Sequence, residues 1–411
     1  MAAGRLDLRT GFRLALLAAL ALRVVFGMVY WTDKPLTHDE HEYLALAASL
    51  AGGHGFTYIE PAAGTTAQFG RAPGYPAFLA MIGAGSTSAE STPTRVKLVQ
   101  AVLGTATVWL IAATAGRVGP NARVGAAWVA AIYPPLVWIP AYVLSETLYS
   151  VLAIATTLAL QNAAERREAQ SFSFSAGLLC GVSILVRPAM LLFVPLAATW
   201  LIVRKANRQL LFFLLGAATV VAPWAVRNVL KYERLVLVAS EGGVTFWTGN
   251  HPLSSGEGDL AANPDLKQAE LDFRRSHPGL TAEELEPLYY RDALRHIVEN
   301  PIWWAGLLAR KAFFTVVPAG PSYAVHSPRY RWASVVSYLL LLPFGIAGAA
   351  MLWRRRERPS ALLLLAASSL LACMIFFPQE RFRIPVIDPA LIVCAAALVR
   401  QSNTATSDIF R

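Results

Sequence analysis

The segment His38-Asp39-Glu40 follows directly after the first long apolar run of the chain. Asp39 could act as a general base there, with Glu40 or His41 orienting it or binding a metal. The same residues could instead begin a helix, with Asp39 or Thr37 as its N-cap. Charged groups beside an apolar core are costly, so each of these residues requires a specific role.

Several arginines also lie next to apolar segments. Arg71 precedes the Pro-rich segment 72–76, where its guanidinium could bind a phosphate through two hydrogen bonds or simply reach the membrane interface. Arg187, Arg381 and Arg383 also fall at the ends of predicted helices. Positive charge at these positions indicates an anionic partner, such as the phosphate of a lipid.

Glu146 begins another predicted helix, in Leu-Ser-Glu-Thr, and either caps that helix or binds a metal or a substrate hydroxyl. His38, His41 and Glu42 have the i, i+3, i+4 spacing of a divalent metal site. Three such groups are common by chance in a polar loop, so the sequence allows a divalent metal ion but predicts no metal site firmly. The three cysteines lie inside apolar stretches, as small buried hydrophobic residues do.

The composition is that of a membrane protein. Hydrophobic residues make up 55% of the 411 residues and charged residues only 15%, against about 25% in soluble domains. The mean hydropathy of +0.45 also excludes a soluble fold. The net charge of +10 comes from basic residues between apolar runs, which indicates membrane topology and not nucleic-acid binding.

Ten segments are apolar enough to be candidate membrane-spanning helices, although two are short. The first contains Arg23 and reads as a retained signal anchor, with either an internal carboxylate or the interface as the partner of that arginine. The two short segments meet at Arg187-Pro188, where proline would bend or break a continuous helix, so they are either one kinked helix or two helices. The ten segments are 13–31, 95–116, 122–140, 144–162, 173–187, 188–203, 209–228, 332–353, 360–377 and 384–400.

The distribution of Lys and Arg predicts the orientation. With the N-terminus in the cytoplasm, cytoplasmic segments hold fourteen basic residues and the short outer turns only three, and the even helix count returns the C-terminus to the cytoplasm. Two long segments, 32–94 and 229–331, then face outward, and long loops of this kind are usually functional. In the first, residues 39–51 predict a helix lying on the membrane surface. In the second, a charged helical stretch is expected near 264–300.

An ordered series of short motifs, HDEHEYLALA, GRAPGYPAFL and LSETLY, resembles the membrane glycosyltransferases of the GT-C fold. More narrowly, it is similar to glycosyltransferase family 39 and its relatives, which include protein O-mannosyltransferases and the transferases that add aminoarabinose to lipid A. LVRPAMLL, APWAVRN, GNHPLSSG and RFRIPVIDP add weaker support. The resemblance extends over nearly the whole chain and implies one all-α, GT-C-like membrane domain over residues 1–411.

The resemblance also implies roles for individual residues. Asp39 would act as the base or orient the acceptor, with Glu40 beside it, and Arg71 would contact the lipid phosphate where relatives often have Lys. The further predicted phosphate contacts are Arg187, Arg381 and Arg383. The further predicted substrate or metal contacts are His41, Tyr43, Tyr75, Glu146 and Asn250.

The expected function is inverting transfer of a sugar from a polyprenyl phosphate to an acceptor hydroxyl, at the periplasmic face of a bacterial inner membrane. Phosphate is already a good leaving group, so the reaction needs mainly a base and cations. The acceptor could be a glycan, a lipid or a protein. Two alternatives stay open: a transporter or lipid flippase, and a glycan polymerase or ligase that uses a lipid-diphosphate donor. The sequence shows no internal repeat of the kind common in transporters.

Overall fold

The computed structural model describes residues 2–57, 70–165, 170–258, 262–318, 328–355 and 360–399, with the backbone alone at 2–6 and 328. These residues are almost entirely helical, and between the gaps they form no strand beyond one isolated bridge from Pro35 to Ser91. The helices are α1 Ala2–Val25, η1 Phe26–Tyr30, α2 His38–Ala51, α3 Gly74–Met81, α4 Thr94–Ala115, α5 Pro120–Ile132, α6 Pro134–Trp138, η2 Ile139–Ala141, α7 Glu146–Glu165, α8 Gln170–Val186, η3 Pro188–Leu192, α9 Phe193–Val203, α10 Asn207–Tyr232, α11 Gly242–Asn250, α12 Pro264–Arg275, α13 Ala282–Glu299, α14 Pro301–Val316, α15 Pro328–Arg354, α16 Ser360–Ile375, α17 Glu380–Arg383 and α18 Ile387–Ala397.

The predicted all-α membrane class is confirmed, and each of the ten predicted segments is mainly helical. The number of spans is not confirmed. Among the described residues, five helical stretches are long and apolar enough to cross a membrane, and the bent pair of α5 with α6 and η2 brings the total to at most six. Four shorter apolar helices complete the bundle, and two of these, α8 and α9, flank Arg187. The chain is extended at Arg187 and continues through the short helix η3. Of the two possibilities that the sequence left open, one kinked helix or two helices, the structure has two helices separated by a break.

The break in the span predicted at 122–140 gives Arg23 a partner that the sequence did not indicate. The helix axis bends by 65° between α5 and α6, at Pro134-Pro135, because proline cannot continue the hydrogen-bond ladder. The last carbonyl groups of α5 therefore lose their helical partners. The guanidinium of Arg23, which is 2% exposed, donates to the carbonyl oxygens of Ala130 at 3.3 Å and Ala131 at 3.4 Å. It caps the broken helix end and meets neither a carboxylate nor the interface.

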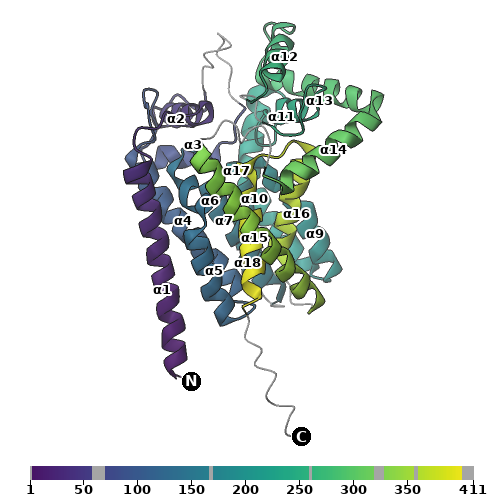
Figure 1. Ribbon diagram of the computed structural model, residues 1–411. Coiled ribbons are helices and arrows are strands. Elements are labelled where there is room, and N and C mark those ends of the chain that lie inside the picture. The colour runs from purple at the N-terminus through teal and green to yellow at the C-terminus, as the bar shows by residue number, and fades with distance from the viewer. Residues whose placement is uncertain are drawn as a thin grey trace.

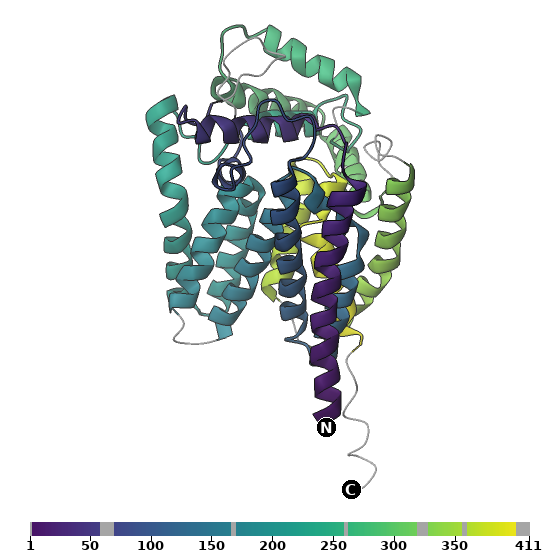
Figure 2. The ribbon, with the colours of Figure 1, turned by 90° about the vertical axis from the view of Figure 1, so that its left-hand side faces the viewer.

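The two long segments predicted to face outward gather at one end of the bundle. In Figures 1 and 2, α2 runs across this end, transverse to α1, and α11–α14 stand above the other helices. Helix α2 follows the predicted 39–51 closely, and α12 and α13 divide the predicted charged stretch at 264–300. Residues 58–69, 259–261 and 319–327 of these segments, and the C-terminal residues 400–411, lie outside the described part of the chain.

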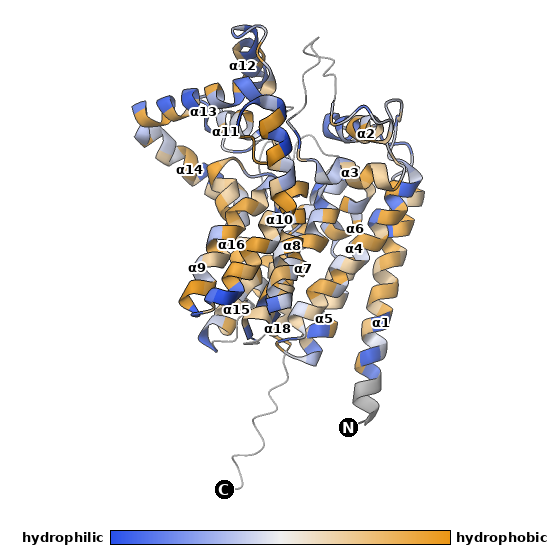
Figure 3. Cartoon of the chain, turned by 180° about the vertical axis from the view of Figure 1, so that it is seen from behind, coloured by the Kyte–Doolittle hydropathy of each residue, from blue (hydrophilic) through white to orange (hydrophobic). Residues whose placement is uncertain are grey.

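Hydropathy separates the bundle from this end. In Figure 3 the long helices are mostly apolar along their length, whereas α12 and α13 carry many polar residues. A small core of Trp247, Leu266, Leu285, Tyr289 and Ala293 holds α11–α13 together, separate from the large apolar core of the bundle. Helices α11–α13 thus form a unit with its own core, packed over one end of the membrane helices.

Candidate active site

Helix α2 is fixed at its start by Glu40 and not by Asp39. The backbone N–H and the hydroxyl of Thr37 both donate to Glu40 Oε2, at 2.8 and 2.9 Å. The other oxygen of Glu40 accepts from the backbone N–H of Val143 at 2.8 Å, which ties α2 to the chain before α7. Burial raises the pKa of Glu40 against these hydrogen bonds. Both oxygens of Glu40 are therefore occupied in holding the helix start in place.

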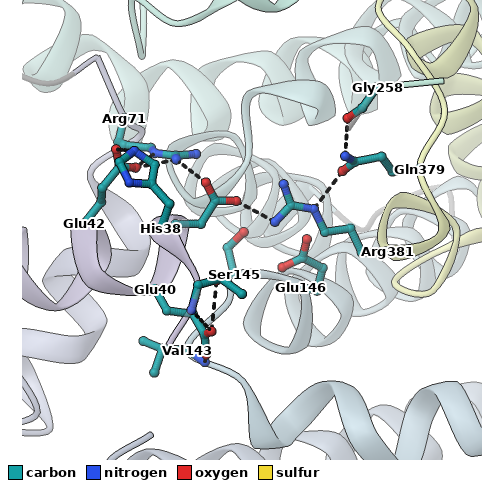
Figure 4. A network of polar contacts seen from close by, with 12 residues as sticks. His38, Glu40, Glu42, Arg71, Val143, Ser145, Glu146, Gly258, Gln379 and Arg381 are labelled. Atoms are coloured by element: carbon teal, nitrogen blue, oxygen red, sulfur yellow. Dashed lines mark hydrogen bonds and ion pairs between the residues drawn. The ribbon is translucent and has the colours of Figure 1, made fainter. Parts of the chain in front are cut away.

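Asp39 is consequently free to point toward two arginines that arrive from distant parts of the chain. Its Oδ1 accepts from Arg71 at 2.5 Å and its Oδ2 from Arg381 at 2.6 Å. Figure 4 shows Arg71 and Arg381 on opposite sides of this contact, with Glu40 directed away from both. The structure thus joins three predicted site residues in one network of ion pairs.

The two arginines differ in how fully they are occupied. Glu42 accepts from two nitrogens of Arg71, at 2.9 Å from Nε and in a shorter contact from Nη2, and Glu241 lies 3.3 Å from its Nη1. All three nitrogens of Arg71 therefore face carboxylates. A guanidinium enclosed by three negative groups is a poor site for a phosphate, because a further anion would be repelled. The environment of Arg71 fits a residue that positions Asp39.

Arg381 and Arg187 have donors to spare. The two guanidinium groups lie over the same ring, that of Phe382, at 5.4 and 4.7 Å from its centroid. Arg187 pairs with Glu146 at 2.7 Å through Nη1, and its Nε and Nη2 contact no described acceptor. Arg381 likewise leaves Nη2 without a partner in the described part of the chain. Two neighbouring cations with unused N–H groups form a ready site for an anion.

Glu146 is also only half used. Its side chain is 2% exposed, its Oε1 pairs with Arg187, and its Oε2 is buried without a hydrogen-bond partner. The hydroxyl of Thr147 is also buried and unpaired, and both residues line a small cavity with Ser150 and Pro385. An unpaired buried carboxylate oxygen is costly, which indicates that Glu146 meets a further polar group when the site is occupied.

The electrostatics of Asp39 decide what it can do. Burial alone would raise the pKa of its carboxyl, but the positive charges and hydrogen bonds of Arg71 and Arg381 hold that pKa well below its usual range. Asp39 is therefore ionised at any physiological pH. In this state it accepts a proton poorly, because a good general base has a pKa near the working pH.

The short segment that carries Arg381 is held by helices α11–α14 and the chain between them. Gln379 accepts from Arg381 Nε at 2.8 Å and donates to the carbonyl of Gly258, as Figure 4 shows. Just before it, Asn250 and Lys311 bind the end of α16: Asn250 donates to the carbonyl of Ile375 at 3.0 Å, and Lys311 donates to Asn250 Oδ1 at 2.9 Å. The position of Arg381 thus depends on how α11–α14 dock.

Arg383 and Asn250 are predicted site residues that lie outside the network around Asp39. Arg383 pairs with the buried Asp388 at 2.7 Å and lies over the ring of Tyr338, so its charge is used inside the helix packing. Asn250 also accepts from Trp304 at 3.1 Å, and with Lys311 all its polar atoms are engaged within the protein. Both residues therefore hold parts of the protein together in this structure, and their predicted substrate contacts stay predictions.

The two predicted tyrosine contacts pack together beside Arg71. Tyr43 lies 5.2 Å below the Arg71 guanidinium and meets Tyr75 edge to face, and the Tyr75 hydroxyl donates to Gln100 at 3.2 Å. Both rings are buried and support the network from below. His41 is exposed on the opposite side of α2. His38 pairs with Glu42 at 2.8 Å, and the described residues contain no group of three or more potential metal ligands.

Sequence reasoning missed several residues of the site. Glu42 was considered only as a metal ligand, although Asp39 and Glu42 share one face of α2 at i, i+3 spacing and could have been expected to bind one cation together. Glu241 and Phe382 carry no signal of their own, because they reach the site through long-range packing.

Comparison with known proteins adds to this geometry. Residues 72–226 match a family described as dolichyl-phosphate-mannose-protein mannosyltransferase. The fold matches an Archaeoglobus fulgidus oligosaccharyltransferase, solved with a tethered acceptor peptide, at a TM-score of 0.59 and 16% identity over 95% of this chain and 49% of that chain. The chain has the GT-C fold. This confirms the fold that the motif series implied.

Two further structures are similar to this GT-C chain. The oligosaccharyltransferase AglB of Archaeoglobus fulgidus, in complex with an inhibitory peptide and a dolichol-phosphate, matches at a TM-score of 0.50 and 14% identity over 96% of this chain and 50% of that chain. ArnT from Cupriavidus metallidurans, bound to undecaprenyl phosphate, covers 94% of this chain and 77% of its own at 13% identity, but its TM-score of 0.45 adds nothing to the fold assignment. The chain spans about half the length of the oligosaccharyltransferases it matches. No curated protein matches its sequence.

Proposed function

We propose that this protein is a membrane glycosyltransferase that moves a sugar from a polyprenyl-phosphate donor to the hydroxyl of an acceptor. The observation that carries the proposal is the grouping of Asp39, Arg381 and Arg187 at one end of a GT-C bundle: one carboxylate beside two arginines with unused donors. The family match to residues 72–226 and the dolichol-phosphate bound to the similar AglB support a lipid-phosphate donor.

Each residue then has one task. Arg187 and Arg381 bind the phosphate of the donor and stabilise the negative charge that grows on it as the sugar leaves. Asp39 accepts the proton of the acceptor hydroxyl while that oxygen attacks the anomeric carbon. Glu146 offers its unpaired oxygen to a hydroxyl of the sugar. A single displacement of this kind inverts the anomeric centre.

The proposal places the site at the periplasmic face of a bacterial inner membrane, with both termini in the cytoplasm. The excess of Lys and Arg in the predicted cytoplasmic segments supports this orientation. Helix α1 also begins at the end of the bundle opposite α2, which Figure 2 makes visible. The acceptor would be a periplasmic glycan, lipid or protein.

The test is transfer by the purified protein in liposomes that contain a synthetic polyprenyl-phosphate sugar, with an envelope extract added as the source of acceptor hydroxyls. Loss of sugar from the lipid is expected, and Asp39→Asn should slow it by about 100-fold or more, the usual contribution of a general base. Asp33→Asn is the matched control, because it removes an exposed carboxylate from the same loop. Sugar that crosses the bilayer while still attached to its lipid would instead identify a flippase.

The sugar and the acceptor need a separate measurement. Mass spectrometry of envelope glycans from cells with and without the protein would show both at once. A sugar that is missing from one class of glycan in the deletion strain would identify the product. Identical glycans in the two strains, together with no loss of sugar in liposomes, would contradict the proposed activity.

A further inference from the structure

Arg381 serves two neighbours at once. One side of its guanidinium holds Asp39, at 2.6 Å from Nη1, and the other side shares the ring of Phe382 with Arg187. The side chain of Arg381 is 33% exposed, whereas that of Arg71, the other partner of Asp39, is 14% exposed and closed in by carboxylates. Of the two arginines on Asp39, Arg381 is therefore the one that a ligand can reach.

An anion bound between Arg187 and Arg381 would lie close to the carboxylate of Asp39. Two negative groups that share one cation repel each other, and the repulsion is strong where burial limits screening by water. A guanidinium binds a phosphate best through two of its nitrogens at once, but Nε of Arg381 already donates to Gln379 and Nη1 to Asp39. A two-point contact through the terminal nitrogens therefore requires the nitrogen that Asp39 now occupies.

We propose that the phosphate of the donor and the carboxylate of Asp39 compete for Arg381, so that binding of the donor releases Asp39 to act on the acceptor. The inference rests on the proposed function and deepens it. It means that Arg381 couples the binding of the phosphate to the strength of Asp39 as a base. Arg71 is not part of the competition, since Glu42 and Glu241 keep it in place.

The chemical step balances with these groups alone. The acceptor oxygen forms a bond to the anomeric carbon and gives its proton to Asp39, while the bond from that carbon to the phosphate oxygen breaks. The electron pair leaves with the lipid phosphate, which Arg187 and Arg381 hold. With Arg381 drawn toward the phosphate, Asp39 loses one of the two cations that depress its pKa and becomes a better proton acceptor.

Competition makes a prediction that a simple base does not. Removing the charge of Asp39 should tighten the binding of a lipid phosphate, although it slows transfer. The probe is farnesyl phosphate, titrated into the purified full-length protein in detergent. For Asp39→Asn we expect a Kd about 5- to 20-fold lower than that of the wild type, the range of ordinary coupling between two sites.

Two controls separate this effect from a general change in the protein. Asp33→Asn also removes a carboxylate close to α2 in the sequence, but Asp33 is exposed and lies outside the network around Arg381, so its Kd should stay within about twofold of the wild type. Farnesol lacks the phosphate, and its binding should be equal in all variants. Asp39→Ser serves as a second neutral variant if Asp39→Asn unfolds, with thermal unfolding as the check.

The outcomes are distinct. If farnesyl phosphate binds the wild type no better than farnesol, the protein has no phosphate site here. That result would also contradict the lipid-phosphate donor of the proposed function. Phosphate-dependent binding that Asp39→Asn leaves unchanged or weakens would overturn the competition and leave the transferase proposal standing. Equal tightening by Asp33→Asn would also overturn it, because the effect would then be one of net charge alone.

Discussion

Arg71 and Arg381 both contact Asp39, but their guanidinium groups have different surroundings. The two arginines therefore have different roles. Arg71 faces Asp39, Glu42 and Glu241, whereas Arg381 has one carboxylate partner and an unused nitrogen. A phosphate contact was expected at Arg71 from its place before a Pro-rich turn. In the folded chain that turn brings Arg71 to the acidic face of α2, so we assign phosphate binding to Arg381 and Arg187.

The distinction predicts opposite kinetic effects for two conservative changes. Arg71→Lys keeps the charge but cannot contact Asp39, Glu42 and Glu241 together, so it should lower kcat by about tenfold and leave KM for the lipid donor nearly unchanged. Arg187→Lys should instead raise that KM by about tenfold, because a phosphate contact is lost. Steady-state transfer at varied donor concentration measures both. If Arg71→Lys raises KM as much as Arg187→Lys does, Arg71 also binds the phosphate and our assignment is wrong.

At the residue scale the sequence could indicate which types of residue matter but not how they pair. Asp39 was identified from its place after the first span. Whether Asp39 or Thr37 capped the helix stayed open, and in the structure Glu40 and Thr37 form the cap. Arg71 and Arg381 are separated from Asp39 by 32 and 342 positions, and no local pattern records contacts of that range.

At the element scale, the segment between α16 and α18 connects helices α11–α14 to the site. Lys311 on α14 is fully buried and donates to Asn250 Oδ1 at 2.9 Å and to the carbonyl of Met374 at 3.2 Å. The carbonyl of Met374 lies in the last turn of α16, where a cation also meets the negative end of the helix dipole. Lys311 therefore fixes the point from which the chain runs to Arg381.

Lys311→Met tests this connection. The change fills the space but removes the donors, so the end of α16 should loosen and kcat/KM for transfer should fall by about tenfold, or roughly 1.4 kcal/mol. Arg310→Met is the matched control, since it removes an exposed charge from the same helix and should have little effect. Wild-type transfer by Lys311→Met would show that docking of α14 does not set the position of Arg381.

Glu286 makes the packing of α13 on α11 depend on pH. Burial raises its pKa from 4.5 to about 7, and Glu283 and Glu241 add to the rise. Between these two values the folded protein binds more protons than the unfolded chain, so stability falls as pH rises through this window. Glu286→Gln should remove about 1 to 2 kcal/mol of that pH dependence, after allowance for screening by water.

Thermal unfolding in detergent at pH 4.5 and pH 8 measures this dependence. The wild type should lose more stability between the two conditions than Glu286→Gln does. Glu299→Gln, which removes an exposed carboxylate from the same helix, should behave as the wild type. An equal loss in the wild type and in Glu286→Gln would show that another group is responsible.

Helices could be predicted far better than their breaks. Apolar runs of 15 to 22 residues located all ten segments because burying a backbone in lipid requires helix. The bend at Pro134-Pro135 was missed, although two adjacent prolines are a plain signal. The partner of Arg23 could not be predicted without that bend. The carbonyls to which Arg23 donates lack a helical partner only because α5 ends there.

At the scale of the whole molecule, the proposed function depends on which face of the membrane holds Asp39. Helices α2 and α11–α14 gather at one end of the bundle, and α1 begins at the other, so a single orientation decides the location of the site (Figure 1). The Lys and Arg distribution predicts that α1 begins in the cytoplasm. The lipid donor would then be used at the opposite, outer face.

Cysteine labelling can test this orientation in the native background, because Cys180, Cys373 and Cys394 are all buried. Ser276→Cys places a thiol at the exposed end of α12, and Arg208→Cys places one near the start of α10, at the predicted cytoplasmic end. A membrane-impermeant maleimide should label Ser276→Cys in intact spheroplasts and Arg208→Cys only after permeabilisation. The reverse pattern would place Asp39 and its arginines in the cytoplasm, and the donor would then have to present its phosphate on that side.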